Sequence, residues 1–278
     1  HPDLFFRSSL VFVFVDKKKN LTISFYPAMQ IKVEDISFDY SGFMALNHVS
    51  FEVNSGDMLA IIGQNGSGKS TLLKCLNRIL RVERGTIRIG SAFLKDYSSG
   101  QLARTIAYIP QSGEVVEGMS VFDTVLLGRK PYIGNKPGAA DMKLVVRLLE
   151  RLELQTVAMR NLSTLSGGQQ QRVYIARALA QQPAVLLLDE PIANLDMNHQ
   201  MKVMKLLQQL ASEGLIVVIT IHDINMAARF CNKALMLKHG GVFASGCRSV
   251  YTPENVENLY DMQVDVIHHK NGICIIPQ

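Results

Sequence analysis

The chain has 278 residues, of which 47% are hydrophobic, so it is long enough for a sizeable core in one or two domains. Its formal net charge is +5, of which residues 1–28 carry +2 and residues 29–278 carry +3. No dense Lys/Arg stripe accompanies that charge and no apolar run approaches the roughly 18–20 residues of a membrane span, so the sequence favours neither nucleic-acid binding nor a membrane-spanning protein.

Residues 1–28 differ in pattern from the rest of the chain. They contain LVFVFV, a six-residue apolar run followed by KKKN. A signal peptide has a longer apolar core and a small-residue cleavage site. We expect 1–28 to be a non-native or disordered extension without a role, and 29–278 to form a single domain.

The first regular elements are strands. IKVEDISF and HVSFEV alternate apolar and polar residues, as half-buried antiparallel strands do, while MLAII is a short buried run and GTIRIG a further strand. Tyr40 lies on the antiparallel strands, where it is a candidate for stacking on an adenine ring. The alternative is an aromatic side chain that packs in the core.

The segment GQNGSGKS at 63–70 fits the P-loop pattern GxxxxGK[ST] between a strand and a helix. Its backbone N–H groups and the helix N-terminus favour a phosphate, Lys69 can reach the β- and γ-phosphates, and Ser70 can bind Mg²⁺. We expect Leu72, Leu73, Leu76, Ile79 and Leu80 to face inward on the helix. The predicted nucleotide-binding residues here are Gly63, Asn65, Gly66, Ser67, Gly68, Lys69, Ser70 and Thr71.

Gln111, in YIPQ, lies where the pattern changes. Its amide can contact Mg²⁺ or an attacking water. The following stretch, about 112–170, has Gly/Pro interruptions around helical segments such as LVVRLLERLEL, and we predict a helical subdomain inserted in the nucleotide-binding core.

AVLLLDE and LIVVIT are uniformly apolar strands separated by an amphipathic helix, which predicts a parallel sheet covered on both faces. Asp189 would hold Mg²⁺ through water, and Glu190 would polarise the water that attacks the γ-phosphate. His222 follows the next strand at the carboxyl edge of the sheet, where a γ-phosphate contact is expected.

LSGGQ at 165–169 precedes a further helix. Ser166, Gly167, Gly168 and Gln169 at a helix N-terminus predict a second anion site. Because the P-loop already binds its own nucleotide, this second site needs the nucleotide of another chain, as in a symmetric head-to-tail dimer.

Together GQNGSGKST, YIPQ, LSGGQ, VLLLDE, the NLD at 194–196 and TIHD resemble, in order, the motif set of ATP-binding cassette (ABC) ATPases. The resemblance covers about 30–278. It implies a P-loop NTPase fold of class α/β, with an N-terminal antiparallel β subdomain, and it implies ATP and Mg²⁺ as cofactors. By this resemblance Tyr40 stacks on adenine, Gln111 is the Q-loop residue, Asp196 the D-loop aspartate and His222 the switch histidine.

SVFDTVLLGRKPYIGN, LDMNHQ and HDINMAARF resemble a narrower group, the importer ATPases for ferric siderophores, haem, cobalamin and, in some members, molybdate or tungstate. That likeness implies a homodimer at the cytoplasmic face of the membrane, two transmembrane permease subunits and an extracytoplasmic solute-binding protein, without nucleic acid. Ile192 and Ala193 depart from the threonine and serine more usual in the family.

Three alternatives stay open: an exporter ATPase with a separate permease chain, a soluble ABC protein acting on DNA or the ribosome, and a P-loop small-molecule kinase. The kinase is disfavoured by LSGGQ. The soluble class is disfavoured because neither a long coiled coil nor a second cassette is present.

The remaining conspicuous residues have unremarkable interpretations. The four cysteines lack CxxC spacing, which predicts inert thiols. Met197, Met201 and Met204 have the spacing of packing residues on a helix, and His268 and His269 fit a solvated C-terminal strand better than a metal site.

Overall fold

The computed structural model describes residues 29–111, 118–269 and 272–278; the predicted extension 1–28 lies outside these ranges. The described strands form an antiparallel sheet in the order β2-β1-β4-β5, a larger sheet in the order β10-β9-β3-β8-β7-β6, and the hairpin β11-β12. Their bounds are β1 Gln30–Tyr40, β2 Phe43–Asn54, β3 Met58–Ile62, β4 Arg84–Ile89, β5 Ala92–Phe93, β6 Ile106–Ile109, β7 Val185–Asp189, β8 Ile216–Thr220, β9 Lys233–Lys238, β10 Gly241–Gly246, β11 Val264–His269 and β12 Gly272–Pro277.

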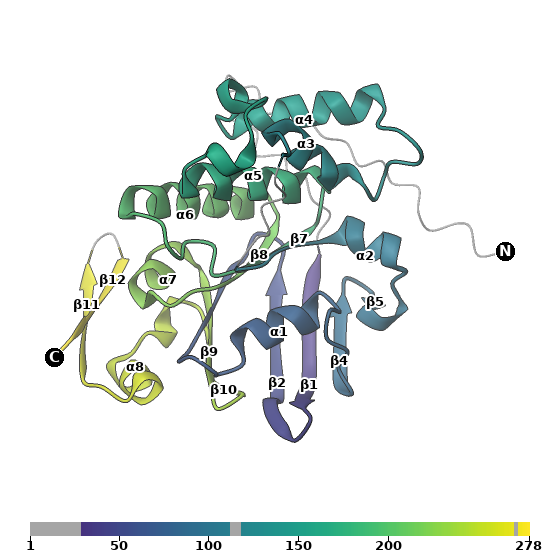
Figure 1. The fold of residues 1–278 in the computed structure, drawn as a ribbon. Helices are drawn as coiled ribbons and strands as arrows, with labels where there is room; N and C mark the ends of the chain where they lie inside the picture. Colours follow the sequence, from purple (N-terminus) through teal and green to yellow (C-terminus); the bar gives the residue numbers. More distant parts are fainter. Residues whose placement is uncertain (1–28, 112–117, 270–271) are drawn as a thin grey trace.

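The helices lie around the larger sheet (Figure 1). Their bounds are α1 Lys69–Leu76, α2 Ser99–Thr105, α3 Val121–Leu126, α4 Ala139–Arg151, α5 Gly167–Ala180, α6 Met197–Ser212, α7 Ile224–Phe230 and α8 Pro253–Tyr260. No helix among the described residues is both long enough and apolar enough to cross a membrane.

The larger sheet is parallel from β9 to β6, with β10 antiparallel at its edge. Every residue of β3, β7 and β8 is buried, because helices cover one face and α1 with the antiparallel sheet covers the other. Uniform burial on both faces explains why these strands show no alternation in the sequence. The predicted α/β class with a parallel sheet and an N-terminal antiparallel subdomain is confirmed.

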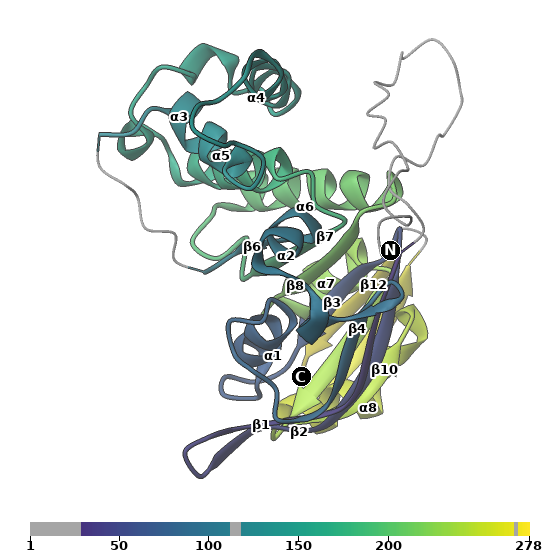
Figure 2. The same cartoon turned by 90° about the vertical axis from the view of Figure 1, so that its right-hand side faces the viewer.

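Helix α1 lies beside the antiparallel sheet in Figure 2. Leu72, Leu73 and Leu76 are fully buried in one cluster with residues of β1, β3 and β7. The prediction for Ile79 is wrong: the helix ends at Leu76, and Ile79 lies beyond it with 55% of its surface exposed. The apolar spacing continued past the point where the chain leaves the helix.

Helices α3, α4 and α5 form a layer at the top of Figure 1, away from β1 and β2. Their apolar faces join the cluster that also covers the larger sheet. The expected boundary near residue 170 falls inside α5, which runs on unbroken to Ala180.

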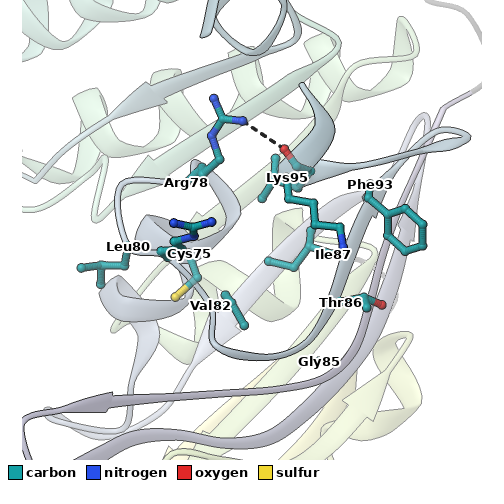
Figure 3. A pocket seen from close by; sticks show the side chains of 11 residues that line it. Cys75, Arg78, Leu80, Val82, Gly85, Thr86, Ile87, Phe93 and Lys95 are labelled. Atoms are coloured by element: carbon teal, nitrogen blue, oxygen red, sulfur yellow. Dashed lines mark hydrogen bonds between the residues drawn. The ribbon is translucent and has the colours of Figure 1, made fainter. Parts of the chain in front are cut away.

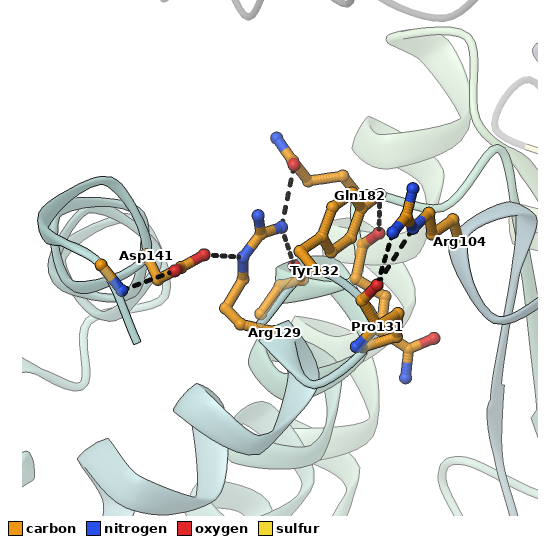
Figure 4. Close-up of polar contacts among 9 residues, drawn as sticks. Arg104, Arg129, Pro131, Tyr132, Asp141 and Gln182 are labelled. Atoms are coloured by element: carbon orange, nitrogen blue, oxygen red, sulfur yellow. Dashed lines mark hydrogen bonds and ion pairs between the residues drawn. The ribbon is translucent and has the colours of Figure 1, made fainter. Parts of the chain in front are cut away.

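A buried arginine fixes this layer (Figure 4). Arg129 is 8% exposed and donates to Asp141 Oδ1 at 2.8 Å, to the Ala180 carbonyl at 2.8 Å and to Gln182 Oε1 at 2.8 Å. Its guanidinium also lies 4.0 Å from the centre of the Tyr132 ring. The arginine thus joins the start of α4 to the end of α5.

The packing of α6 only partly follows the prediction for its methionines. Met204 is fully buried and Met201 packs against the core, whereas Met197, in the first turn, is 78% exposed. Helical spacing alone did not reveal that the first turn projects beyond the core.

The thiols are isolated. Cys75 and Cys231 are buried, and burial raises the pKa of each to about 12, while Cys247 and Cys274 are exposed and unpaired. His268 is exposed on β11, and no cluster of potential metal ligands occurs within the described ranges.

Candidate nucleotide-binding site

The candidate site lies at one edge of the larger sheet. The P-loop follows β3, Gln111 follows β6, Glu190 follows β7 and His222 follows β8, and these strands are parallel. The carboxyl ends of parallel strands meet at one edge, so the fold brings these segments together as the sequence predicts.

The P-loop ends at an uncapped helix. Gly68 is the N-cap of α1 with φ of 101°, and no side chain caps the helix. A Cβ on Gly68 would lie 2.5 Å from the Ala45 carbonyl oxygen, so this position requires glycine both for its conformation and for space. The first N–H groups of α1 are therefore left for a ligand, and the helix dipole favours an anion there.

Lys69 is folded against its own loop. Its side chain is largely buried, and Nζ donates to the Gly63 carbonyl at 2.8 Å and to the Gln64 carbonyl at 3.0 Å. Burial lowers the pKa of Lys69, while the nearby Glu190 and Asp189 carboxylates oppose that effect. A partly desolvated cation of this kind interacts strongly with a phosphate.

The loop borders a hollow of about 130 Å³ whose wall includes Gln64, Asn65, Gly66 and Ser67. Ser67 Oγ is buried and has no hydrogen-bond partner among the described residues. A buried hydroxyl without a partner is costly, and a phosphate oxygen would satisfy it.

Asp189 is held by hydroxyl groups. Its Oδ1 accepts from Ser70 Oγ at 2.9 Å and from Thr220 Oγ1 at 2.7 Å, and the Tyr108 hydroxyl lies 3.4 Å from Oδ2. Burial, followed by the neighbouring Asp189 carboxylate, raises the pKa of Tyr108 to about 12. The Ser70–Asp189 pair is the oxygen pair that the sequence predicts for Mg²⁺.

Glu190 lies between the two other predicted catalytic side chains. Gln111 Nε2 donates to Glu190 Oε2 at 2.6 Å, and His222 Nε2 lies 2.5 Å from Glu190 Oε1. Glu190 has a left-handed φ of 49°, uncommon for this residue, and its N–H donates to Thr220 Oγ1 at 2.8 Å. Backbone strain of this kind often occurs at functional sites.

The signature segment is a capped helix start. Ser166 is the N-cap of α5, and Ser166 Oγ accepts from the Gln169 N–H at 3.4 Å while Gln169 Oε1 accepts from the Ser166 N–H at 3.2 Å. Among the described residues, no hydrogen bond joins Ser166–Gln169 to the P-loop. Within one chain the two predicted anion sites are therefore separate.

Two further predicted residues are engaged locally. Asp196 caps α6 by accepting the His199 N–H at 2.9 Å. Tyr40 is 43% exposed and meets Phe38 edge-on, with ring centres 4.8 Å apart. Its exposure argues against a core role, which leaves stacking on adenine as a prediction.

Thr220 and Tyr108 were missed by sequence reasoning. Thr220 is fully buried and connects Asp189 to the Glu190 backbone. It is the only polar residue in the strand run LIVVIT, which was a usable signal. Tyr108 lies two residues before Pro110 in YIPQ, and nothing in that string indicates its contact with Asp189.

A second hollow, of about 470 Å³, lies between the end of α1 and strands β4 and β5 (Figure 3). Its wall includes Cys75, Arg78, Phe93 and Lys95 and none of the predicted nucleotide-binding residues. Arg78 donates to the Leu94 carbonyl at 3.3 Å and to Tyr97 O at 2.5 Å, so it holds the chain after β5.

The chain matches known proteins over most of its length. A family model described as ABC transporter matches residues 46–193. An uncharacterized ABC transporter ATP-binding protein of Methanocaldococcus jannaschii is 41% identical over 89% of this chain and 97% of its own length. A hemin import ATP-binding protein of Deinococcus radiodurans is 39% identical over 86% and 93%.

Solved structures agree with these relatives. An inward-facing ABC transporter ascribed to the metal-chelate type has a TM-score of 0.79 and 34% identity, covering 90% of this chain and 97% of the other. A bacterial ABC transporter cassette solved as a dimer has a TM-score of 0.70 and 32% identity, covering 78% and 98%.

Proposed function

The chain belongs to the ABC transporter family as an ATP-binding, ATP-hydrolysing subunit, and we propose that it drives the import of a metal chelate. The observation that supports the proposed hydrolysis mechanism is the placement of Glu190. One of its carboxylate oxygens accepts a hydrogen bond from Gln111, and the other contacts His222. These two contacts orient a carboxylate next to the P-loop lysine, where it can act as a general base.

In the proposed mechanism the P-loop binds the phosphates. Lys69 exchanges its contacts with loop carbonyls for phosphate oxygens, and the N–H groups at the start of α1 receive the same anion. Glu190 takes a proton from the attacking water, and His222 contacts the γ-phosphate and keeps Glu190 in place.

Mg²⁺ fits the donor set. Ser70 Oγ and Asp189 Oδ1, 2.9 Å apart, are hard oxygen ligands of the kind that magnesium prefers. When bound, the ion would neutralise charge on the phosphates. Gln111 remains a proposed third ligand, although in this structure its amide contacts Glu190.

We further propose a homodimer in which Ser166 and the signature glycines of one chain close over the nucleotide of the other. The capped start of α5 supports this because the Ser166 hydroxyl, which accepts from Gln169, still has a proton to donate. Two permease subunits would span the membrane, with the ATPase at the cytoplasmic face and an extracytoplasmic binding protein delivering the solute.

The substrate class rests on the named relatives. A cobalamin import ATP-binding protein of Halobacterium salinarum, 36% identical over 86% of this chain and 60% of its own length, joins the hemin import relative as support for a metal chelate. The test is to co-express the chain with candidate permeases and reconstitute the complex in vesicles with hemin or cobalamin on the binding-protein side. ATP-dependent uptake supports the proposal, and ATP-dependent efflux would identify an exporter instead.

A further inference from the structure

The first turn of α6 lies directly against the signature segment. A Cβ placed on Gly168 would lie 2.2 Å from Cδ2, 2.6 Å from Cγ and 3.0 Å from Nε2 of His199. These distances are far below van der Waals contact, so the imidazole ring occupies the space that any side chain at position 168 would need. The neighbouring Gly167 differs, because a Cβ there would meet only Leu195 Cδ2, at 3.4 Å.

The other edge of the ring is fixed by Asp196. His199 Nδ1 lies 2.6 Å from Asp196 Oδ2, while Asp196 Oδ1 accepts the His199 N–H. The His199 backbone N–H, followed by its ring, lowers the pKa of Asp196, so the carboxylate is an ionised acceptor at neutral pH. Both carboxylate oxygens therefore hold one histidine in one orientation.

The same turn also contacts the chain that follows Glu190. Gln200 Nε2 donates to the Ile192 carbonyl at 3.3 Å, and the Ala193 N–H donates to the Glu190 carbonyl at 3.1 Å. One helical turn thus meets the signature through His199 and the segment after the proposed general base through Gln200. Because packed segments transmit displacement, a movement of either one bears on the other.

We propose that His199 is a positioning residue, whose ring, fixed by Asp196, sets the place of the signature Gly167–Gly168 backbone relative to the segment that carries Glu190. It touches neither nucleotide nor water in this role. The proposal rests on the proposed function, since it assigns the ring to alignment of the signature for the partner's nucleotide.

A size exchange tests the contact. Gly168→Ala should lower the thermal unfolding midpoint and reduce ATPase turnover about tenfold or more, because the methyl group and the ring cannot occupy one space. His199→Ala should reduce turnover by a similar factor with the folded state retained. Compared with Gly168→Ala alone, the double variant Gly168→Ala/His199→Ala should recover the thermal unfolding midpoint and part of the ATPase turnover. The reason is that the methyl group enters the space left by the ring.

Two controls isolate the ring. Gly167→Ala adds a methyl group at the adjacent signature glycine, where it does not meet the ring. Its effect on the midpoint should therefore be the same in the wild-type and the His199→Ala background. His48 forms the same kind of pair with Asp35, at 2.6 Å, on the antiparallel sheet. His48→Asn suits the left-handed φ of 51° there, and it should leave turnover unchanged.

Three readouts separate positioning from simple stability. In His199→Ala, ATP binding to the single chain should be unchanged, whereas ATP-dependent dimer formation should weaken. His199→Gln, which retains a planar donor for Asp196, should recover part of that loss. If His199 only stabilised the fold, His199→Ala would lower the midpoint but would not weaken dimer formation while leaving ATP binding unchanged.

The inference would be overturned if the double variant lost as much midpoint and turnover as the two single variants lose together. The effects of substitutions at independent positions are additive, whereas those at positions in contact are not. A wild-type chain without ATPase activity would instead contradict the proposed function. The thermal cycle would still decide whether the ring and Gly168 share one space.

Discussion

The starts of α1 and α5 are the two predicted anion sites, and they differ in how their N–H groups are satisfied. At α1 the N-cap is Gly68, which offers no side chain. At α5 the N-cap is Ser166, which exchanges hydrogen bonds with Gln169. Without a cap, the first N–H groups of a helix lack a side-chain acceptor until a ligand binds. A capping side chain accepts from one of these groups and stabilises the helix start in the absence of a ligand.

This difference matches the separate roles proposed for the two helix starts. The α1 start lies beside Lys69 and Asp189 of its own chain, and we propose that it binds the phosphates of that chain's nucleotide. The α5 start has no hydrogen bond to the P-loop among the described residues, and we propose that its anion comes from the partner chain. Substitutions at and around the two helix starts can therefore separate their roles.

The largest expected effect leaves both helix starts intact. Glu190→Gln preserves the shape of the side chain but removes the base, so ATPase turnover should fall about 10²- to 10⁴-fold while ATP binding persists. ATP should then remain bound between the α1 start of one chain and the α5 start of the other, giving an ATP-bound dimer detectable by size-exclusion chromatography. Wild-type turnover in this variant would remove Glu190 from the mechanism.

The far end of α5 should matter for stability. Arg129→Ala removes the donor to the Ala180 carbonyl and leaves Asp141 without its charged partner, which should cost about 3 kcal/mol in thermal unfolding. Arg151→Ala, which breaks the more exposed pair with Glu213, should cost under about 1 kcal/mol. Equal losses would show that Arg129 does not anchor the helix.

The same pair carries a pH dependence. The Arg129 hydrogen bond, more than the Gly138 N–H, lowers the pKa of Asp141 in the folded state. Its contribution is therefore complete above the ordinary Asp pKa of about 3.9 and is lost as the pH falls through the lowered folded value. The difference in unfolding free energy between wild type and Arg129→Ala should narrow in that acidic range, down to the part that comes from the Ala180 and Gln182 hydrogen bonds.

The uncapped start is tested by Lys69→Ala. Loss of a buried, charge-assisted donor should weaken ATP binding to the single chain roughly 10- to 100-fold, as measured by calorimetry. The α5 start has no hydrogen bond to Lys69 and should be unaffected. Unchanged affinity would mean that the lysine stays on the Gly63 and Gln64 carbonyls when nucleotide binds.

The smallest effect concerns the cap itself. Ser166→Ala should destabilise the chain by about 1 kcal/mol, because the Gln169 N–H loses its acceptor. Denaturant unfolding measures this directly. No change would show that the 3.4 Å contact contributes nothing, and the contrast between the two helix starts would lose its energetic basis.

Much of this contrast could be predicted from the sequence, because strand–glycine–helix order determines where the P-loop, Asp189 and His222 must lie. Thr220 and Tyr108 could not, since their roles depend on which strands are neighbours. The exposed Ile79 and Met197 were missed because apolar spacing does not reveal where a helix stops or leaves the core. The His199 ring over Gly168 joins segments 31 positions apart, and no local pattern encodes such a contact.

Whether the α5 start of one chain serves the nucleotide of the other is decided by mixing two defective chains. Ser166→Arg blocks the α5 start by bulk, and Lys69→Ala disables the P-loop. In a mixed head-to-tail dimer one composite site carries both defects, while the other pairs an intact P-loop with an intact signature. We predict ATP-dependent cross-linking between subunits in the mixture and in neither variant alone. If the mixture shows no more cross-linking than the separate variants, each signature serves its own chain and the shared site is contradicted.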